Sequence, residues 1–222
     1  MNLPAKKKYE SARQLERQAK ILAKTREMLA EIGYARTTIR SLADKAGVAP
    51  GTLYNLYNSK DELILAAVQE LLSSLGETVR EQSTRGLDRL ITKQAVNGAT
   101  VRENPEYAEA MTRALIGTQR NDKLRNLLYT STIEHDERHL QIAIEQGHLR
   151  TGTDVQLLAR HLQAQSWGIT VAWVMDTVAL DNIAEETIRS VTLTLLAVAT
   201  AEGEACLREL AERFGLPEWP LC

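Results

Sequence analysis

Apolar residues recur along much of the chain at the spacing of one helix face. The clearest stretch places Ile21, Leu22, Met28, Leu29 and Ile32 at intervals of i, i+1, i+7, i+8 and i+11, which fits a repeat of 3.6 residues. Alternation typical of a strand is scarce. Prolines occur only at positions 4, 50, 105, 217 and 220, so two long tracts contain no residue that interrupts a helix. The pattern predicts an all-α protein.

Capping residues divide the chain into about nine expected helices. Thr38 is suited to cap a short helix, and Gly47 is suited to the tight turn that follows it. Pro50 favours the first turn of the next helix, and Ser59 with Glu62 forms a capping box for a long one. The expected helices cover about 11–32, 38–46, a third from 50, a fourth from 59, 87–101, a sixth from 104, 122–146, 154–177 and 183–213.

The composition is that of a water-soluble globular chain. Of the 222 residues, 44% are apolar, which is enough for a buried core in one or two domains. No apolar run is long enough to span a bilayer, and the first residues do not resemble a secretory signal. We therefore expect a cytoplasmic protein. Cys206 and Cys222 lack the spacing of a zinc site and are interpreted as ordinary thiols.

Charge is divided unevenly between the two ends of the chain. Residues 1–60 contain 12 Lys and Arg against 5 Asp and Glu, whereas the rest contain 15 against 24. A basic module of residues 1–60 on an acidic body of residues 61–222 is typical of a polyanion-binding head joined to a different domain. A solvated surface would give the same division, so both interpretations remain open.

Residues 33–60 contain two short helix signals joined by a glycine turn, a geometry that fits a helix into the DNA major groove. This segment resembles the amino-terminal domain of TetR-family transcriptional regulators over about residues 17–65. The resemblance rests on Gly33-Tyr34, Thr37-Thr38-Ile39-Arg40, Leu42-Ala43, Ala46-Gly47-Val48, Gly51-Thr52-Leu53-Tyr54, Tyr57 and Ser59-Lys60. It implies a three-helix DNA-binding head with a helix-turn-helix, and an all-α body that binds a ligand and dimerises.

Polar side chains of the helix-turn-helix are the candidate DNA contacts. Thr38 and Arg40 stand where a phosphate would approach a helix start. Thr52 and Asn55 carry groups suited to base edges, and the resemblance implies backbone contacts by Tyr54, Tyr57 and Lys60. The alternative for the two tyrosines is a ring at the edge of the core. The full expected set is Thr38, Arg40, Pro50, Gly51, Thr52, Tyr54, Asn55, Tyr57 and Lys60.

Basic residues also precede the head. Lys6, Lys7, Lys8, Arg13 and Arg17 are expected either to reach phosphates as an arm or to form a disordered solubilising tail.

The resemblance also implies a double-stranded DNA operator, a homodimer formed by the last two helices, and a small-molecule effector pocket among the middle helices. Candidate lining residues are apolar or aromatic, as pockets usually are, and ordinary core packing is the alternative for each of them. They are Tyr107, Met111, Leu115, Tyr129, Ile133 and Trp167.

Little in the sequence indicates a metal or an enzyme. His135 and His139 lie four residues apart beside Asp136, but two histidines without a third ligand are weak evidence for a metal. No local catalytic or cofactor-binding motif occurs, so neither a cofactor nor a metal is expected. We predict a repressor that binds a palindromic operator as a homodimer and is released by a ligand. The alternatives are a metal- or redox-responsive regulator using His135, His139 or Cys206, and an all-α protein that does not bind DNA.

Overall fold

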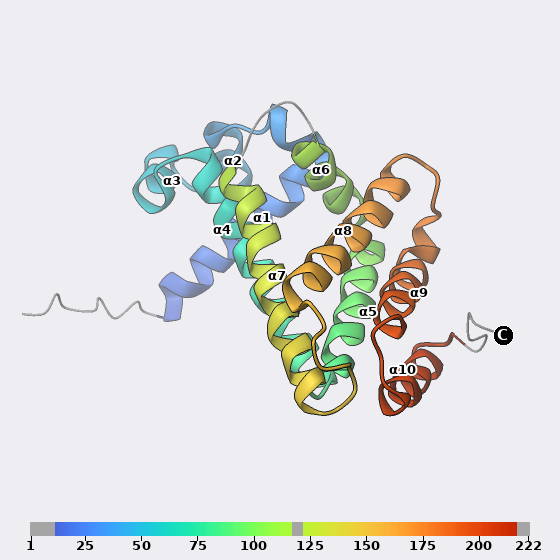
Figure 1. Ribbon diagram of the computed structural model, residues 1–222. Coiled ribbons are helices and arrows are strands. Elements are labelled where there is room, and N and C mark those ends of the chain that lie inside the picture. The colour runs from blue at the N-terminus through green and yellow to red at the C-terminus, as the bar shows by residue number, and fades with distance from the viewer. Residues whose placement is uncertain (1–11, 117–121, 217–222) are drawn as a thin grey trace, which may run out of the picture. The chain divides into compact units, whose positions relative to one another are not determined.

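A computed structural model describes residues 12–116 and 122–216, apart from the side chains of 12–13, 122–125, 127 and 129–131 (Figure 1). Within these ranges the chain forms ten α-helices and one 3-10 turn, and its only β-type pairing is an isolated bridge. The all-α prediction is confirmed. No described helix is both long and apolar enough to cross a membrane. The chain divides into two compact units, Met1–Glu70 and Leu71–Cys222; the expected division after residue 60 stays a prediction.

The first unit, which we call the head, is built on α1 (Ala12–Arg36), α2 (Ile39–Ala46) and α3 (Pro50–Tyr57). Apolar faces of these helices share one core with the first turn of α4 (Lys60–Gln82). Its buried members are Ile21, Met28, Ile39, Leu42, Ala43, Ala46, Leu53 and Leu63. The helix-turn-helix is therefore held by its own hydrophobic core.

The caps predicted for the head are present. The Thr38 hydroxyl accepts a hydrogen bond from Ser41 N at 3.1 Å, and the Ser41 hydroxyl accepts one from Thr38 N. Gly47 adopts the left-handed conformation (φ 68°, ψ 39°) that ends α2. Gly33 interrupts α1 with φ 73° and ψ 168°, so the regular helix stops at Ile32 as expected and one further turn reaches Arg36.

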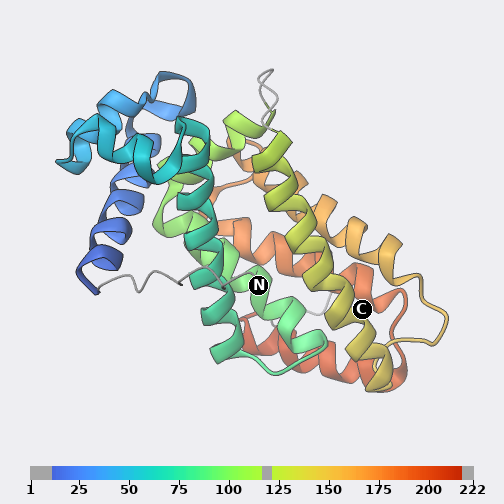
Figure 2. The same cartoon turned by 90° about the vertical axis from the view of Figure 1, so that its left-hand side faces the viewer.

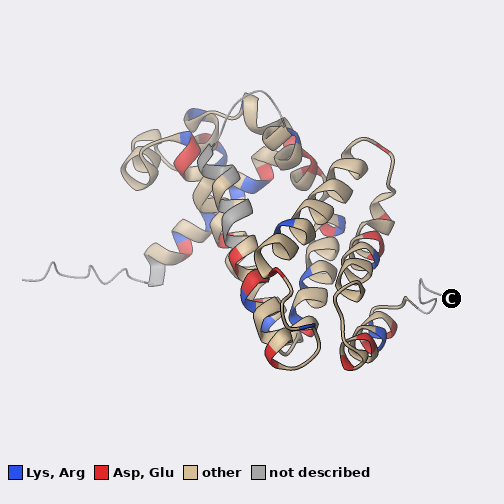
Figure 3. Ribbon diagram, in the orientation of Figure 1, with Lys and Arg blue, Asp and Glu red and all other residues tan. Residues whose placement is uncertain are grey.

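The second unit, which we call the body, contains the rest of α4, followed by α5 (Leu87–Glu103), α6 (Pro105–Ile116), α7 (Asp122–Glu145), α8 (Val155–Val174), α9 (Ile183–Leu196) and α10 (Ala201–Arg213). A 3-10 turn, Leu180–Asn182, precedes α9. Helix α5 contacts α6, α7, α9 and α10, and α8 packs against α7 and α9 (Figure 2). Acidic side chains are prominent on α10 (Figure 3).

A glycine permits the close contact of α5 with α9. A Cβ atom added to Gly98 would lie 2.5 Å from the Cβ and 2.6 Å from the Cα of Ala184. Real Cβ atoms do not approach other carbons so closely, so only glycine lets the two backbones meet at this crossing.

The expected helix over 183–213 is wrong, because the chain turns at residues 197–200 and forms α9 and α10 instead. Ala199 forms an antiparallel bridge with Leu149, and Arg150 N donates to Val198 O at 3.0 Å. The Thr200 hydroxyl then accepts from Gly203 N at 3.1 Å and caps α10. These bonds to the distant 148–150 segment replace helical ones, so the described part of the chain has ten helices rather than about nine.

Helix α8 also differs in detail from its expected range of 154–177. Its cap is Asp154, whose carboxylate accepts from Leu157 N at 2.9 Å, whereas the Thr153 hydroxyl donates to Arg150 O. The helix ends at Val174, and Asp176 then takes a positive φ of 59°.

The junction between α4 and α5 is fixed by arginines. Arg213, at the end of α10, donates to Gln82 O at 2.7 Å and pairs with Asp88 at 2.8 Å. Arg89 donates to Thr84 O at 2.9 Å and to Ser83 O at 3.1 Å. Carbonyl groups at the end of α4 thus find charged donors, as helix ends require.

Candidate DNA-binding face and ligand pocket

Helix α3 presents a polar face because its opposite face is anchored in the head core. Leu53 is fully buried, and Leu56 with Tyr57 packs partly buried against the same core. The exposed residues of α3 are Pro50, Gly51, Tyr54 and Asn55, whereas Thr52 is half-buried. Tyr54 exposes 53% of its surface, so its ring and hydroxyl are accessible to a partner.

At the start of α2, one expected phosphate contact already has a structural role. The Thr38 hydroxyl is engaged in the capping box with Ser41, so it is the backbone at this helix start that is suited to meet a phosphate. Arg40 is exposed two residues further on, within the first turn of α2. Both residues therefore lie at the helix start as expected, with the cation of Arg40 accessible.

Lys60 is held at the start of α4 by a tyrosine. Its ammonium donates to Tyr34 O at 3.3 Å and lies 4.4 Å from the centroid of the Tyr34 ring. The Tyr34 hydroxyl donates to Asp61 at 2.6 Å. Lys60 is thus positioned by a cation–π contact, and its expected phosphate contact remains a prediction.

A second basic feature of the head was only partly anticipated. Arg17 and Lys20 of α1 line a groove with Gly47 and Val48 of the turn that precedes α3. Arg17 was a candidate DNA contact from the sequence but Lys20 was not, because spacing along α1 does not reveal what α1 faces. The other basic residues of the expected arm, Lys6 to Arg13, lie outside the described residues or have undescribed side chains.

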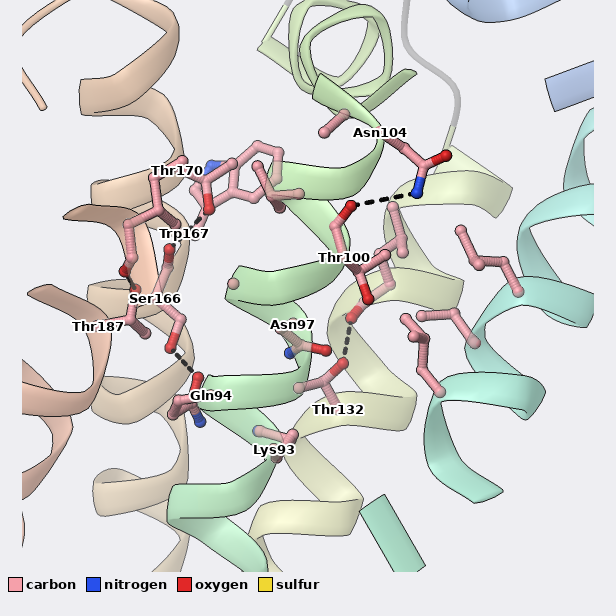
Figure 4. Close-up of a pocket in the computed structure, with 18 of the residues that line it drawn as sticks. Lys93, Gln94, Asn97, Thr100, Asn104, Thr132, Ser166, Trp167, Thr170 and Thr187 are labelled. Atoms are coloured by element: carbon pink, nitrogen blue, oxygen red, sulfur yellow. Dashed lines mark hydrogen bonds between the residues drawn. The ribbon is translucent and has the colours of Figure 1, made fainter. Parts of the chain in front are cut away.

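The body contains one well-lined pocket, of about 240 Å³, among its described residues (Figure 4). Its walls come from α4 to α9, and apolar side chains alternate with uncharged polar ones. The lining residues are Leu71, Leu72, Leu75, Lys93, Gln94, Asn97, Gly98, Thr100, Val101, Asn104, Tyr107, Ala108, Leu128, Thr132, Gln163, Ser166, Trp167, Thr170, Ile183 and Thr187. A cavity of this kind is suited to a small molecule.

The expected lining residues fall into three groups. Tyr107 and Trp167 are on the pocket wall. Met111, Leu115 and Ile133 are not, because Met111 is buried beyond the pocket and Ile133 packs against the core of the body. The side chain of Tyr129 lies outside the described residues. The polar lining was missed, since it comes from separate helices and has no local motif.

Among the described residues of the pocket wall, Lys93 is the charged one, and its ammonium forms an ion pair with the carboxylate of Asp136. Its ammonium lies 2.5 Å and 2.6 Å from the two oxygens of Asp136 on α7. Asp136 is completely buried. Burial raises the pKa of the Asp136 carboxyl, and the Lys93 ammonium opposes that rise. Two short contacts to one ammonium indicate an ionised carboxylate, so this wall carries a neutral ion pair.

His135 and His139 lie beside that ion pair with ring centroids 4.7 Å apart. Burial, together with neighbouring cations such as Lys93 for His135, lowers the pKa of each imidazole to about 4. His139 Nδ1 accepts a hydrogen bond from Gly86 N at 3.3 Å. Both rings are therefore neutral near pH 7 and carry no positive charge that would attract an anionic ligand.

The described residues give little support to a metal-responsive or redox-responsive regulator. No group of three potential metal-binding side chains occurs among the described residues. Burial raises the pKa of the Cys206 thiol, with Glu209 and Asp88 adding to the effect. A thiol with a raised pKa forms less of the reactive thiolate, so Cys206 is poorly suited to redox sensing.

Comparisons with known proteins bear on the head and on the whole chain. Residues 21–67 match the family model described as "Bacterial regulatory proteins, tetR family". The HTH-type transcriptional repressor KstR2 of Rhodococcus jostii is 28% identical over 77% of this chain and 86% of its own length. The fatty acid metabolism regulator protein of Bacillus subtilis is 26% identical over 70% of this chain and 85% of its own.

Among solved structures, the fold is shared with SmeT, the repressor of the Stenotrophomonas maltophilia multidrug efflux pump SmeDEF. The TM-score is 0.67 at 23% identity, over 83% of this chain and 91% of SmeT. SmeT matches equally well in its complex with triclosan.

Proposed function

We propose, from the premise that this chain belongs to the TetR family of transcriptional regulators, that it represses transcription as a homodimer on a palindromic operator and is released by a small molecule. Regulators of this family bind DNA and small-molecule effectors. The observation that carries the proposal is the exposed polar face of α3, which stands above the fully buried Leu53. A helix with such a face fits the major groove.

The exposed face supplies two kinds of contact. Asn55 and Thr52 carry an amide and a hydroxyl, the groups that read adenine and other base edges. Tyr54 and Arg40 are exposed and suited to phosphates, which set the register of the protein on the duplex. Lys20 and Arg17 add positive charge on α1, which strengthens binding to any sequence.

Dimerisation through α8 and α9 is supported by apolar residues of this part of the chain that are exposed to solvent. Leu157 and Leu193 expose 45% and 41% of their surfaces, and Met175, just after α8, exposes 66%. Ala164 and Gly168 are also exposed on α8, and small residues allow two helices to approach closely. Helices α8 and α9 pack together, so one face formed by both suits isologous pairing. A dimer would read half-sites about 34 to 36 Å apart.

The link between ligand and DNA is α4. Leu71, Leu72 and Leu75 of this helix form part of the pocket wall, and the same helix begins at Lys60, shortly after α3 ends at Tyr57. A ligand that displaces these leucines tilts α4 and changes the spacing of the recognition helices. Linkage then requires that the ligand weaken DNA binding by the same factor by which DNA weakens ligand binding. A coupling free energy of about 1 to 3 kcal/mol between the two binding events is enough for a switch.

The test is a mobility-shift assay of the full chain with the DNA upstream of its own gene. Asn55→Ala and Thr52→Ala are each expected to weaken specific binding by about tenfold or more, since a good base contact contributes roughly 1 to 3 kcal/mol. Gln141→Ala, at an exposed position of α7, is the control and leaves affinity unchanged. Absence of binding by the unaltered protein, or equal binding by all variants, would refute the proposal.

A further inference from the structure

Side-chain hydroxyls of the pocket share one arrangement that determines what they offer a ligand. Each of the four threonine hydroxyls donates its proton to the backbone carbonyl four residues earlier in its own helix, at distances from 2.7 to 2.9 Å or, for Thr170, 3.0 Å. The single proton of the Ser166 hydroxyl lies within donating distance, 3.0 Å, of both Leu162 O and Gln94 Oε1, and Figure 4 shows the bond to Gln94. The five bonds run from Thr100 to Val96 O, Thr132 to Leu128 O, Ser166 to Leu162 O, Thr170 to Ser166 O, and Thr187 to Ile183 O. The hydroxyls come from α5, α7, α8 and α9, so they surround the cavity.

A hydroxyl has one proton and two lone pairs. When the proton is committed to a carbonyl, the oxygen can only accept further hydrogen bonds. The Gln94 side chain is engaged at both ends, because its Nε2 donates to Leu90 O at 3.3 Å and its Oε1 accepts from the Ser166 hydroxyl at 3.0 Å. The amides of Asn97 and Gln163 offer a donor and an acceptor alike and favour neither, while Tyr107 and Trp167 bring one hydroxyl and one indole N–H to the wall. The five aliphatic hydroxyls of the wall therefore act toward a ligand as acceptors.

Lys93 is the single charged residue among the described residues of the pocket wall, and it is already paired. The Lys93 ammonium is bound by both oxygens of Asp136, and Asp136 is completely buried. An anionic ligand that drew Lys93 away would leave a buried carboxylate without its partner, which is strongly unfavourable. An anion would also face the lone pairs of the hydroxyls. Free carboxylates are thus poor ligands for this cavity.

We infer that the pocket selects an uncharged, largely apolar molecule that donates hydrogen bonds, with a hydroxyl or N–H group on a hydrocarbon body. Leu71, Leu72, Leu75, Val101 and Trp167 provide the apolar contacts for that body. The inference rests on the proposed function only in taking this cavity as the effector site. Its new content is the chemical class: alcohols and phenols, not carboxylic acids.

The experiment uses three probes of equal heavy-atom count and nearly equal shape: 1-octanol, heptyl methyl ether and heptanoate. Binding to the full-length protein at pH 7.4 is measured by calorimetry, with the change in tryptophan fluorescence, to which Trp167 of the pocket wall contributes beside Trp173 and Trp219, as a second readout. We expect 1-octanol to bind about three- to tenfold more tightly than the ether, the factor that one net hydrogen bond provides. Heptanoate is expected to bind more weakly than either.

A variant ties the preference to the hydroxyls. The double substitution Thr132→Val and Thr187→Val removes two of the five hydroxyl acceptors at constant shape and is expected to bring the ratio of octanol to ether affinity closer to one. Thr25→Val is the matched control, because Thr25 is buried in the head and donates to Ile21 O at 2.9 Å through the same type of bond. It leaves the ratio unchanged.

Three outcomes overturn the inference: no binding of 1-octanol, equal affinity for all three probes, or tightest binding by heptanoate with loss of that affinity in Lys93→Met. Release of DNA is measured separately in the mobility-shift assay. If 1-octanol binds with the expected preference but leaves DNA binding unchanged, the proposed switch fails while the chemical class of the pocket stands.

Discussion

The ion pair between Lys93 and Asp136 gives the most decisive test of the physical description of the body. The Lys93 side chain is 11% exposed and that of Asp136 is fully buried. Asp136→Leu leaves a buried ammonium without its counter-charge, and Lys93→Met leaves a buried carboxylate alone. Each is expected to lower the free energy of unfolding by about 3 to 5 kcal/mol, a large share of the roughly 5 to 15 kcal/mol that stabilises a typical domain.

Removing both charges together is expected to behave differently. In Lys93→Met with Asp136→Leu, no charge is left unpaired, so the double variant should lie within about 1 kcal/mol of the unaltered protein or be more stable by about 1 to 4 kcal/mol. The two single losses therefore do not add. The resulting coupling energy of several kcal/mol far exceeds the half kcal/mol or so within which distant sites add.

Urea unfolding, followed by circular dichroism at one fixed protein concentration, measures the four free energies of the cycle. The control pair is Arg113 and Glu109, an exposed pair 2.7 Å apart on α6, which should show a coupling of about 0.5 kcal/mol or less. Additive losses at Lys93 and Asp136, or single losses below about 1 kcal/mol, would refute the conclusion that the two charges depend on each other in the core.

Three further predictions concern separate parts of the chain. Gly98→Ala is expected to lower the free energy of unfolding in urea by about 1 to 3 kcal/mol because its Cβ would overlap α9. Gly76→Ala, whose Cβ would meet only Arg80 Nη1 at 3.6 Å, should be neutral or stabilising. His135 and His139 have a pKa of about 4 when folded and an ordinary value of 6.5, so the stability they contribute is complete above pH 6.5 and is lost as the pH falls toward 4. After discounting for solvent exposure we expect the free energy of unfolding to fall by about 1 to 2 kcal/mol between pH 7 and 5. This fall should be absent when both histidines are changed to Gln, and a variant with the same pH dependence as the unaltered protein would contradict the prediction. Ala49→Ser supplies the side-chain cap that α3 lacks and should raise the melting temperature through a gain of about 1 kcal/mol; an unaltered melting temperature would show that Pro50 already fixes this turn.

The head was predictable because its signals are local. Thr38, Gly47 and Pro50 each act on backbone groups within four residues, so their type and spacing were enough to locate α2 and α3. The break at 197–200 was not, since Ala-Val-Ala-Thr contains no residue that stops a helix. It depends on hydrogen bonds to Leu149 and Arg150, which no local pattern reveals.

Most of the pocket lining, too, could not be predicted from local sequence patterns. Aromatic and methionine side chains were chosen as candidates because they are frequent in pockets, and Tyr107 and Trp167 do line it. Met111 satisfied the same criterion but is buried away from the cavity. The threonines and Gln94 are unremarkable in sequence, and they gain their chemical meaning only when several helices bring them to one cavity.

The C-terminal end of helix α4 is held in place, because Arg213 donates a hydrogen bond to the carbonyl oxygen of Gln82. A sideways displacement of the middle of the helix can therefore act as a tilt about this end. The helix rises about 1.5 Å per residue, so Leu72 lies about 15 Å along it from Gln82 and Lys60 about 33 Å. If the proposed switch tilts α4 about this end, the displacement of each residue grows with its distance from Gln82, and it is about twice as large at Lys60 as at Leu72.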